Sequence, residues 1–83
     1  MTYERQLELT ADRLRQLPAP RLEAAQDRVY ALLESMTPRP VPRLRSIGWA
    51  DQVLVIGRDV PAEARAALEE ALRDLRRSFD LTV

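Results

Sequence analysis

Apolar positions recur every three or four residues in the first part of this chain, which predicts amphipathic helices there. The first helix is predicted for residues 3–17, with Thr2 placed to cap its first turn and Pro18 ending it. The second is predicted from about residue 19 to residue 36. Because the connection between them is only a few residues long, the two helices are expected to fold back as an antiparallel hairpin.

Prolines dominate residues 37–43, which read Thr-Pro-Arg-Pro-Val-Pro-Arg. Each proline ring fixes its own φ angle and keeps the preceding residue extended. The segment is therefore predicted to be a semi-rigid strap that separates the hairpin of residues 1–36 from the second half of the chain.

The second half, residues 44–83, is predicted to be a strand–helix unit. Residues 52–57 hold the run Val-Leu-Val-Ile followed by glycine, which is typical of a short strand covered on both faces. A long helix is predicted for about residues 60–78. Residues 44–47 and 80–83 are further strand candidates that the pattern leaves open. The predicted fold class is α+β, in one small domain.

Composition narrows the chemistry. All 13 basic residues are Arg, 13 acidic residues balance them, and the chain contains no His, Cys or Lys. The side chains that most often act as nucleophile, general base or zinc ligand are thus missing, so we expect no enzyme, no metal and no cofactor. No signal peptide or membrane span is evident, which favours the cytoplasm. A core built from 83 residues without a disulfide or metal favours a homo-oligomer or a protein partner.

The one local basic patch consists of Arg39, Arg43 and Arg45, with Trp49 close behind. Guanidinium groups fork onto phosphates and an indole stacks on a base, so the patch is a candidate nucleic-acid contact. A net charge of zero gives no overall field to attract DNA. A protein interface or a solvated linker explains the same residues.

Candidate partner-binding side chains lie on the apolar faces of the predicted helices and beside the strap. Trp49 and Tyr30 are expected to be the main anchors, because aromatic side chains often dominate interface energetics. The full set of candidate residues is Tyr30, Leu33, Met36, Trp49, Leu72, Leu75 and Phe79. A helix stripe looks the same whether it faces a core, a second copy or a different protein, so the pattern leaves these alternatives open.

Residues 14–33 read as a leucine-ended helix, a Leu-Pro corner at Leu17 and Pro18, and a helix with Tyr30 close to a Leu-Leu pair. This pattern resembles small bacterial antitoxin-like proteins related to the Phd and VapB group. The resemblance implies toxin binding by an amphipathic helix laid in a groove, and it implies no catalytic residues.

The sequence therefore favours a non-catalytic protein-binding module, with an antitoxin-like protein as its most specific version. Two alternatives stay open. One is a small homodimeric DNA-binding regulator that uses the basic patch of both chains, and the other is a self-assembling structural protein.

Overall fold

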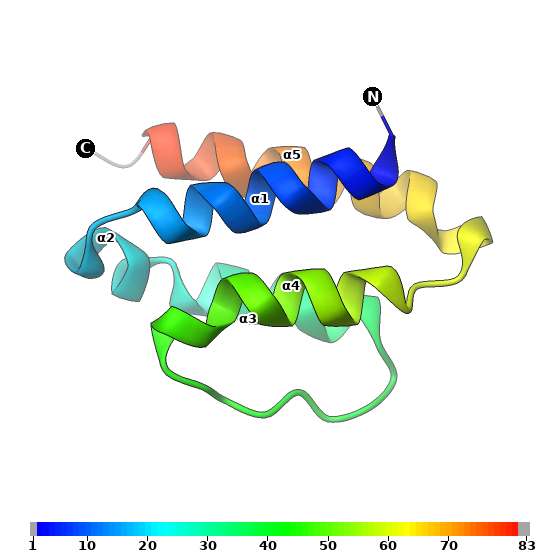
Figure 1. The fold of residues 1–83 in the computed structure, drawn as a ribbon, viewed down its shortest axis with the longest axis horizontal. Helices are drawn as coiled ribbons and strands as arrows, with labels where there is room; N and C mark the ends of the chain where they lie inside the picture. Colours follow the sequence, from blue (N-terminus) through cyan, green and yellow to red (C-terminus); the bar gives the residue numbers. More distant parts are fainter. Residues whose placement is uncertain (1, 82–83) are drawn as a thin grey trace.

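The structure is a computed structural model that describes residues 2–81. Within that range the chain forms five α-helices and two short 3-10 turns, and no strand (Figure 1). Their bounds are α1 Tyr3–Gln16, α2 Ala19–Ala24, α3 Gln26–Met36, η1 Ser46–Gly48, α4 Trp49–Arg58, η2 Ala62–Ala64 and α5 Arg65–Leu81. The predicted α+β class is therefore wrong, because the described chain is all-α.

The four longer helices pack as a bundle in which α1 contacts α4 and α5, and α3 contacts the same two helices. In Figure 1, α1 and α5 run in one direction while α3 and α4 run in the other. The first two predicted helices do run in opposite directions, but α1 and α3 occupy diagonal positions. The predicted N-terminal hairpin is therefore corrected: the main contacts of α1 lie in the second half of the chain.

A break at Ala25 lets the chain reach the diagonal position. Its φ of −90° and ψ of 0° depart from helical values and divide the predicted second helix into α2 and α3. The Ala25 N–H bonds to the carbonyl of Leu22 at 3.0 Å, one residue short of the α-helical pattern. Because neither glycine nor proline marks the break, the periodicity of residues 19–36 did not reveal it.

The run predicted as a strand, residues 52–57, lies in α4. As a helix it places Trp49, Val53 and Gly57 four residues apart on one buried face, while Val55 points outward. The preference of Val and Ile for strands is worth only about 1 kcal/mol, and burial of this stripe exceeds it. Packing therefore overrides the β propensity of the run.

Of the remaining predicted elements, one is confirmed and the others are corrected. The first helix and its cap are confirmed, since the Thr2 hydroxyl accepts from the Arg5 N–H at 3.2 Å. The strand considered for residues 44–47 is wrong, because this segment is extended and then enters η1. Asp80 and Leu81 belong to α5 rather than to a strand, and residues 82–83 lie outside the described residues.

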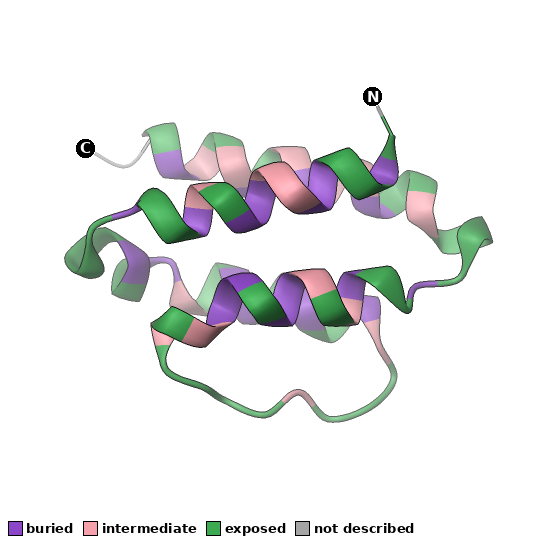
Figure 2. Ribbon diagram, viewed as in Figure 1, coloured by how far each residue is buried: buried purple, intermediate pink, exposed green. Residues whose placement is uncertain are grey.

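Figure 2 shows that the buried residues line the facing sides of the helices, where they form one apolar cluster. Helix α1 approaches α4 closely at Gly57. A Cβ atom at Gly57 would lie 2.4 Å from Cδ2 of Leu7, which is fully buried. The Tyr3 hydroxyl donates to the Gly57 carbonyl at 2.7 Å. Burial raises the pKa of Tyr3, although the nearby Arg65 opposes this shift, so the hydroxyl keeps its proton.

A polar contact joins α1 to α5. Arg76 donates to the hydroxyl of Thr10 at 2.9 Å and to the side-chain oxygen of Gln6. Gln6 and Thr10 are both buried, and Gln6 was not expected in the core. Burial lowers the pKa of Arg76, and the neighbouring Arg73 lowers it further. The contact helps to fix the register of two helices that are also joined by apolar stripes and by the ion pair of Arg13 with Asp80.

Replacing Gly57 with Ala is expected to destabilise the fold by about 1 kcal/mol. Overpacking against Leu7 costs roughly 1–3 kcal/mol, which exceeds the 0.5–1 kcal/mol that Ala contributes through helix propensity. Urea unfolding of both proteins measures the difference. In a Leu7→Ala background the same substitution is expected to be neutral or stabilising, because the side chain it strikes is gone. A Gly57→Ala protein more stable than the parent in both backgrounds would contradict the close approach.

Candidate functional site

The strap predicted for residues 37–43 is extended, and it connects the end of α3 to η1 without regular secondary structure. It runs along one edge of the bundle, beside α3 and α4 (Figure 1). Prolines at 38, 40 and 42 remove every second N–H group, so the strap cannot pair as a strand. Its polar backbone groups therefore need partners from side chains or water.

Three buried side chains hold the C-terminal end of the strap. The Tyr30 hydroxyl accepts from the Leu44 N–H at 2.8 Å and donates to the side-chain oxygen of Gln52 at 2.9 Å. The Gln52 amide in turn donates to the Pro42 carbonyl at 2.8 Å. The Trp49 indole N–H donates to the Leu44 carbonyl at 3.1 Å, and its ring meets that of Tyr30 edge-on at 5.8 Å between centroids. We call Tyr30, Trp49 and Gln52 the strap anchor.

The three arginines of the predicted basic patch differ in their contacts. Arg43 stacks over the Tyr30 ring, 4.2 Å from its centroid, and donates to a carboxylate oxygen of Glu34 at 3.3 Å. The guanidinium of Arg43 therefore already has its partners on α3. Arg39 and Arg45 are exposed and form no ion pair with any residue that the structure describes.

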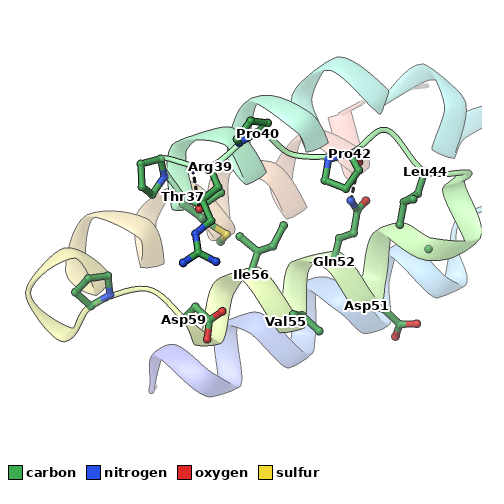
Figure 3. Close-up of a pocket in the computed structure, with 14 residues that line it drawn as sticks. Thr37, Arg39, Pro40, Pro42, Leu44, Asp51, Gln52, Val55, Ile56 and Asp59 are labelled. Carbon is green, nitrogen blue, oxygen red and sulfur yellow. Dashed lines mark hydrogen bonds between the residues drawn. The ribbon is translucent and has the colours of Figure 1, made fainter.

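A groove of about 790 Å³ lies between the strap and the outer face of α4. We call it the strap groove; Figure 3 shows its lining side chains. The lining residues are Met36, Thr37, Pro38, Arg39, Pro40, Pro42, Leu44, Gly48, Asp51, Gln52, Val55, Ile56, Asp59 and Pro61. Four of them are prolines, so much of the wall is preorganised. Leu44 and Val55 both line the groove and are 47% and 63% exposed, which is a high exposure for large apolar side chains.

Charged groups stand at the rim. Arg39 extends from the strap toward the C-terminal end of α4, where Asp59 is located (Figure 3). Asp59 forms no ion pair with any residue in the described range. Asp51, at the other end of the groove, accepts from Arg15 of α1 at 3.2 Å. The groove therefore carries one unpaired cation and one unpaired anion at its Asp59 end.

All seven predicted partner-binding residues are buried, and none lies on the exposed surface of the described chain. They come from α3, α4 and α5, and only Met36 lines the strap groove. That these residues contact a partner stays a prediction, and contact with most of them would require the bundle to open. The exposed groove residues Leu44, Val55 and Asp59 were not predicted as a site. That they line one groove depends on α4 being a helix, and the sequence pattern favoured a strand there.

The chemistry available in the described range is limited. Ser35 and Ser78 each donate to a carbonyl of their own helix at 2.6 Å. Asp51 on α4 and Asp59 at its C-cap are eight residues apart, about 12 Å along the helix axis, which is farther than paired acid–base carboxylates are placed. No three His, Cys, Asp or Glu side chains of the described residues gather as a metal site. Likewise, none of the helices described combines the length and apolar character that crossing a membrane requires.

Tyr30→Phe is expected to destabilise the protein by about 1–3 kcal/mol, since it leaves the Leu44 N–H and a buried Gln52 oxygen without their partner. Urea unfolding monitored by fluorescence of Trp49, the single tryptophan, measures the loss. Tyr3→Phe is the matched control. The carbonyl that Tyr3 contacts also accepts from the Val60 N–H at 3.3 Å, so this variant is expected to lose less than 1 kcal/mol. Equal losses in the two variants would show that the strap anchor is not a special contact.

Comparison with known proteins gives this chain no family. No family model matches it, and neither a curated protein nor a solved structure does. Its function is therefore argued from the strap groove.

Proposed function

We propose that this chain is a non-catalytic protein-binding module and that it binds its partner through the strap groove. The exposure of Leu44 and Val55, which both line this groove, carries this proposal. Large apolar side chains exposed in one groove of a small protein are typical of an interaction site, because their exposure costs free energy unless something covers them.

The shape of the groove supports a polypeptide as the bound molecule. It is lined mainly by aliphatic and proline side chains, with charged side chains at the rim. This arrangement of an apolar centre and a polar rim is that of a protein interface. The prolines lower the entropy cost of binding, because the strap is already extended before a partner arrives.

A non-catalytic role is supported by the side chains that remain near the groove. The chain has no His, Cys or Lys, and the two groove carboxylates are too far apart to act as a pair. The antitoxin-like version of this proposal rests on the resemblance of residues 14–33. A toxin gene beside the gene for this protein is the observation that would support that version.

Selection of random peptides displayed against the purified protein tests the proposal. Bound peptides are expected to share apolar residues and to lose roughly tenfold or more in affinity for a Val55→Arg variant. The added Arg would lie between Asp51 and Asp59 on the surface of α4, so it is expected to leave the fold intact. Ala67→Arg on the exposed face of α5 introduces the same charge away from the groove and is expected to change affinity less than twofold.

Two results would overturn the proposal. One is a set of selected peptides without a shared apolar pattern. The other is a set that binds the Val55→Arg and Ala67→Arg variants equally well. Circular dichroism of each variant confirms that it is folded before affinity is measured.

A further inference from the structure

We infer that the partner taken by the strap groove is a second copy of this chain, docked so that Arg39 of each copy meets Asp59 of the other. This inference rests on the proposed function of the groove. It goes further in naming the partner and the pair of charges that sets the docking.

The helices leave few other surfaces for association between copies. The apolar stripes of α1, α3 and α5 are consumed by the core. Among the residues whose burial is described, the exposed large apolar side chains are Leu44, Ile47 and Val55. Two of these three line the strap groove, so an apolar contact between copies is concentrated there.

The charges of the groove suit a twofold interface. Arg39 and Asp59 approach the same end of the groove from opposite walls, and neither has an ion-pair partner in the described range. In a twofold dimer, a contact from residue i to residue j is always accompanied by one from j to i. One unpaired cation and one unpaired anion on each copy therefore satisfy each other twice. A partner with charge of a single sign would leave one of them unpaired in a buried interface, which is costly.

Size and overall charge agree with this pairing. A standard interface buries about 800 Å² per partner, roughly 15% of the 5209 Å² that the chain exposes. The strap edge runs along the longest dimension of the molecule, 35 Å, and so offers a broad contact (Figure 1). Because the net charge is zero, two copies approach without overall repulsion.

Charge reversal and mixing test the inference. Arg39→Asp and Asp59→Arg are each expected to weaken the dimer at least tenfold, because each homodimer then brings like charges together twice. An equimolar mixture of the two variants is expected to restore association, because both contacts in the mixed dimer again join opposite charges. Sedimentation equilibrium over a dilution series measures the dissociation constants. Restoration on mixing separates a contact between copies from one within a chain.

Matched controls use the same charge changes elsewhere. Arg28→Asp and Glu23→Arg lie on exposed positions outside the groove and are expected to leave the dissociation constant within about twofold of the parent. A parent protein that stays monomeric up to about 1 mM overturns the inference. So does a dimer that tolerates both groove reversals, or one that mixing fails to restore.

The two proposals fail in different ways. If the chain is monomeric yet selected peptides bind in a manner that Val55→Arg abolishes, the groove is a protein-binding site for another partner. If selected peptides show no dependence on Val55 and the dimer also ignores the groove variants, both proposals fall.

Discussion

The exposed surface of this protein depends on one constraint: the polar backbone groups of the strap, residues 37–43, cannot be satisfied within a helix or a strand. Prolines at alternate positions of residues 37–43 exclude both helix and strand. At the C-terminal end of the segment, side chains that α3 and α4 bring from inside the bundle bond to the Pro42 carbonyl and to both backbone groups of Leu44. A polar network that fixes a strap at a set height above α4 also fixes the width of the groove between them. The groove is thus a product of how the backbone was satisfied, rather than of a loop that happens to stand away from the core.

Three of the helix contacts are each specified by a directional polar interaction. Tyr3 and the carbonyl of Gly57 join α1 to α4, Arg76 and Thr10 join α1 to α5, and Tyr30 and Gln52 join α3 to α4. Apolar stripes alone pack in several registers with similar free energy, whereas a misplaced buried polar group loses its partner. In a bundle of this size, such contacts favour the native register over alternative registers of the same helices. Surface ion pairs such as Glu4 with Arg58 add less, since solvent screens the attraction between exposed charges.

The sequence predicted the structure correctly where a single local rule determines the conformation. Thr2 caps α1, the spacing of leucines defines the apolar face of α1 and α5, and alternate prolines define the strap. It failed where tertiary packing decides. Residues 52–57 carry β-branched side chains, and only the presence of α1 opposite Gly57 makes a helix the better use of them. Ala25 breaks a helix without a breaking residue, which sends α3 to a diagonal position that loop length did not indicate.

The candidate site depended on the same error. The groove lies between the strap and α4, and the sequence pattern predicted a strand in place of α4. The pattern therefore did not predict a groove. One signal was present and was missed: Gln52 is a polar residue at the start of an apolar run. A buried amide has two donors and an acceptor that need partners, and a neighbouring proline-rich segment that cannot pair as a strand leaves carbonyls available, of which the Gln52 amide bonds to that of Pro42.

The diagonal placement of consecutive helices has a consequence for how the chain folds during synthesis. The partners of α1 are 36 to 70 residues away, as the contacts of Arg15 with Asp51 and of Gln6 with Arg76 indicate. Helical bundles with short connections usually close local contacts first and fold rapidly, whereas here the loops around α1 must be closed before any of its burial is gained. Although α1 is made before the other helices described, it is therefore among the last of them to acquire tertiary contacts. Its apolar face stays in water until α4 and α5 have been made, and during this interval α1 is prone to aggregation or to chaperone binding.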